Sequence, residues 1–197
     1  MSRARRRLIF VFAVGLFSIL WQAIAAPKEQ SISSVTSSAV TSTPVMIVAV
    51  TGTNALVVRT VDGDTLVVRL DGEDVDQTVR LLGVDTPETV DPRREVGCFG
   101  QEASAYTAAR LLNRRVRLDA DLEADNRDKY DRLLRNVVLM DEAELDFNGQ
   151  LVREGYAYAY TSFPQNKNRK AQLRLWQDEA MKAERGLWNP KTCAGKK

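Results

Sequence analysis

TLVVRLDGEDVDQTVRLLGVDTPE, residues 65–88, contains two β-rich runs joined by a polar turn. TLVVRL and TVRLLGV are rich in valine, which favours strands, and the Asp and Gly between them favour a turn. The stretch therefore predicts an antiparallel hairpin. Pro87 lacks a backbone N–H and biases Thr86 toward an extended conformation, so the chain must leave the second strand at DTPE.

Further strands and helices are predicted on both sides of this hairpin. The other strand-like runs are MIVAV (46–50), ALVVRTV (55–61), RRVRLDA (114–120) and RLLRNVVLM (132–140). Helical spacing marks residues 102–113, with a face of Ala103, Tyr106, Ala109 and Leu112; a short helix ending at Gly155; and a last helix with a face of Leu173, Trp176, Ala180, Ala183 and Leu187. This order predicts an α+β fold, in which a small antiparallel barrel carries helices, compatible with a five-stranded OB-type barrel.

The N-terminal segment, residues 1–26, has the features of a targeting signal. A basic start precedes an apolar run, and Ala23-Ile24-Ala25 supplies an A-x-A cleavage site. We favour cleavage after Ala25, but an uncleaved membrane anchor also fits, because 19 apolar-rich residues span a bilayer of ~30 Å. Either way the domain is expected outside the cytoplasm, secreted or tethered to a membrane by this segment alone.

The remaining chain divides into a linker, a domain and a tail. Nine of the thirteen residues in 31–43 are Ser or Thr, so we predict a flexible linker over 27–44. The folded domain is expected at 45–190 and a C-terminal tail at 191–197. We expect a monomer.

Composition excludes several kinds of chemistry. The chain has no histidine, so it builds neither a Ser-His-Asp triad nor a His-ligated zinc site. Its formal charge is +2, but the targeting segment holds four arginines and no acid, which leaves 24 basic and 26 acidic side chains. Any polyanion must therefore meet a local basic site rather than a basic surface.

The two cysteines, Cys98 and Cys193, lie far apart in the chain. An even number in an exported protein favours a disulfide, although two unpaired thiols are the alternative. The bond would close a loop of about 95 residues and add roughly 4–5 kcal/mol to stability on the chain-entropy model.

Carboxylates and arginines gather in three short motifs. DGD ends at Asp64, DTPE carries Asp85 and Glu88, and arginines stand at Arg80 and Arg132. DGD alone is most often a hairpin turn, and DTPE alone is most often a solvated loop. Together, the oxygens suit a hard cation such as Ca²⁺, and the arginines suit a phosphate. The combination predicts phosphodiester cleavage.

One of these pairs conflicts with simple strand geometry. Arg80 and Asp85 are five residues apart, which places them on opposite faces of a regular strand. Gly83 lies between them and could supply a bulge that corrects the parity. The alternative is that Arg80 is an ordinary outward-facing strand residue.

The chain contains, in this order, the motifs VDGDT, RLLGVDTPE, FGQEAS, DKYDR, LVREGYA and GLW. In their order and approximate spacing, the chain resembles the staphylococcal nuclease family from about Ala55 to Trp188. The resemblance implies an OB-fold barrel with three helices. It also implies Ca²⁺-dependent hydrolysis of single- and double-stranded DNA and of RNA, with 3′-phosphate and 5′-hydroxyl products.

The resemblance also assigns roles to individual residues. Metal ligands would be Asp64, Asp85 and the backbone carbonyl of Thr86; catalytic residues would be Arg80, Glu88 and Arg132; substrate-binding residues would be Lys129 and Tyr130. Cysteines before FGQEAS and after GLW resemble those of disulfide-bearing exported members, which supports pairing Cys98 with Cys193.

The chain departs from the family pattern in two places. Asp131 replaces the common glycine before Arg132, and its carboxylate would add negative charge beside the phosphate site. The aromatic residues expected after GYA do not align securely, with Tyr158, Tyr160 and Phe163 as candidates. An inactive OB-fold module that binds nucleic acid is therefore one alternative, and a two-carboxylate glycosidase is another.

Overall fold

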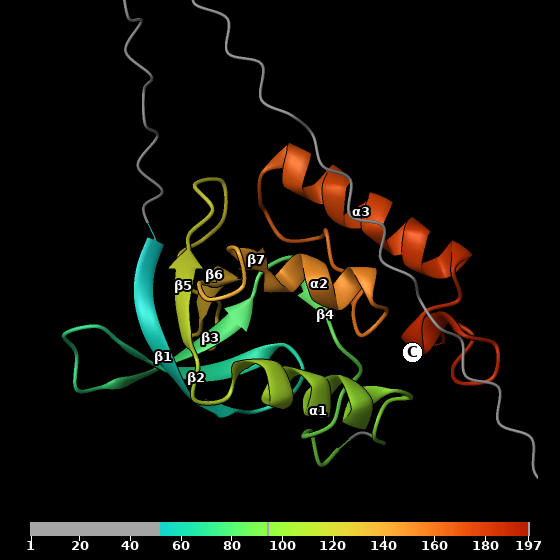
Figure 1. Ribbon diagram of the computed structural model, residues 1–197, viewed down its shortest axis with the longest axis horizontal. Helices are drawn as coiled ribbons and strands as arrows, with labels where there is room; N and C mark the ends of the chain where they lie inside the picture. Colours follow the sequence, from blue (N-terminus) through green and yellow to red (C-terminus); the bar gives the residue numbers. More distant parts are fainter. Residues whose placement is uncertain (1–51, 94, 197) are drawn as a thin grey trace, which may run out of the picture. The chain divides into compact units, whose positions relative to one another are not determined.

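The computed structural model describes residues 52–93 and 95–196 (Figure 1). The predicted targeting segment (1–26), the linker (27–44) and the predicted strand at 46–50 lie outside the described residues. Within the described part of the chain, no helix is both long and apolar enough to cross a membrane.

Five strands form a closed barrel. They are β1 (Gly52–Thr60), β2 (Thr65–Leu70), β3 (Asp76–Leu81), β5 (Arg115–Asp119) and β6 (Leu133–Leu139). Neighbours pair antiparallel in the order β3-β2-β1-β5-β6, and β3 then pairs with β6 in parallel. This last pairing closes the sheet on itself, which confirms the predicted α+β barrel of OB type.

The predicted hairpin is confirmed as β2 and β3, with Thr65 opposite Arg80. Three short strands were not predicted: β4 (Val84–Asp85), β7 (Leu145–Asp146) and β8 (Tyr158–Ala159). Strand β7 extends the sheet beside β6, while β4 and β8 pair with each other. The barrel interior is filled by fully buried aliphatic side chains, among them Val57, Leu66, Val79, Val116, Val137 and Leu139.

Three helices pack on the barrel (Figure 1): α1 (Gly100–Leu111), α2 (Phe147–Arg153) and α3 (Lys167–Lys182), followed by a short 3-10 helix, η1 (Gly186–Trp188). Helix α1 packs against β1, α2 packs against β6, and α3 packs against α2. Asp146 and Asn166 cap α2 and α3, because their side chains accept hydrogen bonds from the first free backbone N–H groups.

The predicted helix faces are partly wrong. The buried stripe of α1 runs through Ala103, Thr107 and Leu111, whereas Ala109 and Leu112 are exposed. Steps of four follow the helix period more closely here than the predicted steps of three. The last helix ends at Lys182, so Ala183 is exposed and Leu187 is buried from η1 instead.

The predicted disulfide between Cys98 and Cys193 is confirmed, with a Cα–Cα distance of 5.8 Å. Cys193 is buried beside Tyr158 and Leu187, so the segment after η1 packs on the domain. The bond joins the chain just before α1 to the C-terminal segment, which are far apart in sequence.

Candidate active site

Asp64 ends the turn between β1 and β2. The turn is closed by the Val61 N–H, which donates to the Thr65 carbonyl at 2.9 Å. Gly63 makes a close approach possible, because a Cβ there would lie 2.7 Å from the Thr86 side chain. The Thr86 N–H consequently reaches Asp64 and donates to its Oδ2 at 2.8 Å. The DGD turn and the DTPE loop are thus held together.

Arg80 and Asp85 face the same space, although they are five residues apart. Strand β3 ends at Leu81, and a turn with Gly83 at a φ of 78° starts β4. A side chain at Gly83 would also lie within 2.6 Å of Leu173. A glycine turn, rather than the predicted bulge, therefore brings Arg80 and Asp85 to the same side despite their odd spacing. Arg80 is 8% exposed, so it is not an outward-facing strand residue.

The Arg80 guanidinium connects the turn and both acids. Its Nη1 donates to the Val84 carbonyl at 2.7 Å and also to the Leu81 carbonyl. Its Nη2 lies 3.0 Å from Asp64 Oδ2 and 3.3 Å from Asp85 Oδ1. One nitrogen thus bridges the two carboxylates, which places the predicted ligands next to each other.

Asp64 as a whole residue is only 5% exposed. Burial raises its pKa to about 7, and the nearby Asp62 and Asp85 carboxylates act in the same direction. Arg80 and the Thr86 N–H oppose the rise without cancelling it. The protein groups around Asp64 therefore stabilise its ionised form only weakly.

Glu88 is held by the backbone of its own loop. Its Oε1 accepts hydrogen bonds from the N–H groups of Thr89, Val90 and Asp91 at 2.8–3.1 Å. The bond from Val90 is the main cause that lowers the Glu88 pKa, so the carboxylate is ionised at neutral pH. Oε2 receives no hydrogen bond from the described residues.

Arg132 is oriented by a residue that sequence reasoning missed. Asp128 Oδ2 accepts from Arg132 Nε at 2.7 Å and lies 2.7 Å from Nη2. Burial opposes ionisation of Asp128, but the bonds from Arg132 and from the Tyr130 N–H lower its pKa overall. Asp128 is the first residue of DKYDR. Its position four residues before Arg132 was the sequence signal that could have indicated this ion pair.

The predicted acids and both arginines line one cavity of about 300 Å³, named here the carboxylate cleft. Its lining residues are Asp62, Asp64, Thr65, Arg80, Asp85, Thr86, Pro87, Glu88, Asp91, Arg93, Tyr130 and Arg132. Residues from β3, the turn before β2 and the loop before β6 thus converge. In residues 52–93 and 95–196, no three Cys, Asp or Glu side chains are grouped closely enough to hold a metal by themselves.

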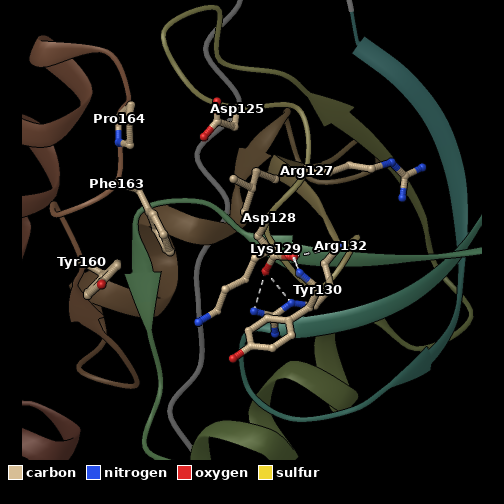
Figure 2. Close-up of a pocket in the computed structure, with 10 residues that line it drawn as sticks. Asp125, Arg127, Asp128, Lys129, Tyr130, Arg132, Tyr160, Phe163 and Pro164 are labelled. Carbon is tan, nitrogen blue, oxygen red and sulfur yellow. Dashed lines mark hydrogen bonds and ion pairs between the residues drawn. The ribbon is translucent and has the colours of Figure 1, made fainter.

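A second cavity of about 380 Å³, the aromatic pocket, adjoins the cleft and shares Tyr130 and Arg132 with it (Figure 2). The other lining residues are Asp125, Arg127, Asp128, Lys129, Leu134, Tyr160, Phe163 and Pro164. The rings of Tyr160 and Phe163 meet edge to face at 4.9 Å. Tyr130 is 67% exposed, and Lys129 Nζ lies 4.9 Å from its ring centroid.

The candidate aromatic residues after GYA thus divide into two groups. Tyr158 is 8% exposed, and its hydroxyl donates to the Lys196 carbonyl at 2.8 Å, so it belongs to the interior. Tyr160 and Phe163 line the aromatic pocket. Arg93, which lines the carboxylate cleft and donates to Asp91 at 2.9 Å, was also missed by sequence reasoning, since a charged loop gives no pattern.

Asp131 does not line either cavity. Its backbone has a φ of 63°, a conformation that glycine adopts without strain. The side chain is 87% exposed, and its Oδ1 lies 3.4 Å from Arg127 Nη1. The carboxylate is thus directed toward Arg127 and lies outside both cavities.

Comparison with known proteins agrees with this geometry. The family model described as staphylococcal nuclease homologue matches residues 78–190. The chain is 43% identical over 119 residues to a thermonuclease of Staphylococcus intermedius, covering 60% of this chain and 67% of that protein. It is 39% identical over 120 residues to a thermonuclease of Staphylococcus hyicus, covering 61% and 68%. Endonuclease YncB of Bacillus subtilis is 33% identical over 112 residues, with 57% and 51% covered. The chain belongs to the staphylococcal nuclease family.

Proposed function

We propose that this protein is a Ca²⁺-dependent nuclease that hydrolyses DNA and RNA to products with 3′-phosphate and 5′-hydroxyl ends. The observation that carries the proposal is the carboxylate cleft, in which the three predicted acids and the two predicted arginines, from separate segments, line one cavity. The relatives named as thermonucleases and an endonuclease support the same reaction class.

The oxygen donors of the cleft fit a hard cation. Asp64 and Asp85 both approach one nitrogen of Arg80, so their carboxylates are close enough to coordinate the same cation. Burial disfavours the ionised form of Asp64, and a bound cation would stabilise that form. Ca²⁺ is coordinated by carboxylate, carbonyl and water oxygens together. Two carboxylates, the Thr86 carbonyl and waters would therefore be suitable ligands without a third acid. When bound, the ion would polarise the phosphate and offset its charge.

The reaction itself is assigned to Glu88 and the arginines. Glu88 Oε2 accepts a proton from a water, whose oxygen attacks phosphorus. The bond from phosphorus to the 5′ oxygen breaks, and this oxygen takes up a proton to become a hydroxyl. The phosphate remains on the 3′ side. Arg132 and Arg80 provide positive charge beside the additional negative charge of the transition state.

The aromatic pocket is proposed to hold a nucleotide next to the scissile phosphate. Lys129 supplies a charge for a neighbouring phosphate, and the exposed ring of Tyr130 supplies a stacking surface between the two cavities. Tyr160 and Phe163 add apolar edges for a base. A pocket that accepts any stacked base is consistent with cleavage of both DNA and RNA.

Calcium should control both activity and stability. We expect digestion of single-stranded DNA to require added Ca²⁺ and to stop with chelator. Calcium at 100 times its dissociation constant should also stabilise the native state by about 2.7 kcal/mol, measured by denaturant unfolding.

Asp85→Asn tests the ligand assignment directly. The variant replaces a charged carboxylate ligand by a neutral amide, so it should bind Ca²⁺ more weakly. Its unfolding midpoint should therefore rise only at higher Ca²⁺ concentrations than the wild type requires. Full activity of the wild type in chelator would contradict the metal assignment, and an unchanged calcium response in the variant would remove Asp85 from the ligands.

Asp131→Gly should leave nuclease activity unchanged. Its carboxylate is exposed and paired with Arg127, outside both cavities, so it exerts little field on the phosphate site. Initial rates on single-stranded DNA at low ionic strength check this, since screening is weakest there. A clear gain in rate would show that the acid acts on the cleft after all.

The location and oligomeric state are also proposed. A disulfide between Cys98 and Cys193 is typical of proteins in oxidising compartments, which supports an extracytoplasmic location. We propose that the protein acts there as a monomer, secreted or tethered through its N-terminal segment.

A further inference from the structure

Asp125 is the one charged residue of the aromatic pocket whose side chain is not engaged by another described residue. Asp128 is bound by Arg132, and Lys129 lies near the Tyr130 ring. Arg127 donates to Asp131 and to Gln77 at 2.6 and 2.9 Å. Across residues 52–93 and 95–196, no side-chain hydrogen bond or ion pair involves Asp125, although it lines the pocket.

The position of Asp125 is nevertheless fixed. On one side, Glu123 accepts a hydrogen bond from the Asn166 side chain at 2.9 Å. On the other side, the Asn126 carbonyl accepts from the Leu134 N–H at 3.1 Å, and the Asn126 side chain accepts from Arg135 at 2.6 Å. Anchors on both flanks hold the intervening residue in place.

A further hydrogen bond connects the two segments that border the pocket. Asp121 also accepts from the Asn166 N–H, at 2.8 Å, so the loop before β6 is tied to the start of α3. Phe163 and Pro164 lie just before that start, on the opposite wall. Figure 2 shows Asp125 and Pro164 on separate segments toward the top of the view, with the Arg127 guanidinium directed away from the other labelled side chains.

We propose, on the basis of the nuclease function above, that Asp125 reads the edge of the nucleobase in the aromatic pocket and favours guanine. An ionised carboxylate only accepts hydrogen bonds. Guanine offers it two adjacent donors, N1–H and the N2 amino group, whereas thymine offers one N–H between two carbonyl oxygens that the carboxylate repels. The Tyr160 and Phe163 rings hold any base, and Asp125 adds the discrimination.

The test is the base composition around the cut in single-stranded DNA of random sequence, read by sequencing the product ends. This readout does not require knowing which side of the scissile bond occupies the pocket. In the wild type, guanine should exceed thymine about tenfold at one position fixed relative to the cut, as for a bidentate base contact.

Asp125→Asn should remove this preference, because the amide has one acceptor and brings donors that suit the thymine oxygens. Asp125→Ala should remove it as well. Asp131→Asn is the matched control, since it removes a neighbouring carboxylate that lines neither cavity, and it should keep the preference for guanine. An identical base profile in the wild type and Asp125→Asn would overturn the proposal.

Failure of the nuclease function itself would look different. If the wild type cuts no DNA, the proposed function is wrong, whereas cutting without base preference rejects only the role of Asp125. Binding of GMP and TMP, measured by calorimetry, tests that role independently of cleavage. The wild type should bind GMP about tenfold more tightly, and equal affinities would reject the role.

Discussion

Glu88→Gln should lower the turnover of single-stranded DNA by at least about 10²-fold, the usual contribution of a general base. The glutamine carbonyl can accept the bonds from the Thr89 and Val90 N–H groups, so the loop should keep its shape. The amide nitrogen cannot take a proton from water. The measurement is kcat with Ca²⁺ saturating, together with the free energy of unfolding.

A matched variant separates catalysis from charge. Glu102→Gln removes one exposed carboxylate from the first turn of α1, outside the carboxylate cleft, and should keep full activity. An unchanged kcat in Glu88→Gln would remove Glu88 from the reaction. Equal losses in both variants would show that the effect is one of overall charge.

Replacing both Cys98 and Cys193 by alanine should lower the free energy of unfolding by roughly 4–5 kcal/mol on the chain-entropy model. The bond closes a loop with a sequence separation of 95 residues, so most of the domain is constrained in the unfolded state. The measurement is the denaturant midpoint, compared with the wild type before and after reduction. Reductant should bring the wild type to the midpoint of the double variant.

The same bond also supports the proposed catalytic base. Gly97, next to Cys98, donates its N–H to the Glu88 carbonyl at 2.7 Å, which closes the loop that begins at Glu88. Loss of the bond should therefore lower kcat more than it raises KM, since the base would be less well placed. Midpoints that do not change on reduction would contradict the assigned stability of the bond.

Local sequence was sufficient wherever one segment decides its own conformation. The valine-rich runs predicted the β2–β3 hairpin. The DTPE proline marks the end of β4, but it did not predict that the turn at Gly83 ends β3 earlier, at Leu81. Such signals act between neighbours and are visible in a short window. They predicted less well the inner faces of α1 and α3, because the packing partner selects which side of a helix is buried.

The sites could be predicted only in part. The acids and arginines were identifiable as residue types, but their convergence was not. Arg80 and Asp85 have the wrong spacing for one face of a strand, and only the turn at Gly83 brings them to 3.3 Å. Asp125, Tyr160 and Phe163 belong to loops without periodicity, so no sequence pattern indicated their shared pocket.

By itself, then, the sequence determined the order of the five barrel strands and the three helices, the histidine-free chemistry of acids and arginines, and the two cysteines available for a bond. Only the tertiary structure decided that Arg132 lines the same cleft as Arg80. The parallel pairing of β3 with β6 sets Arg80 opposite Leu134 and so brings two distant segments to one cleft. The physical reason is that barrel closure is a long-range pairing, whose partners no local pattern specifies.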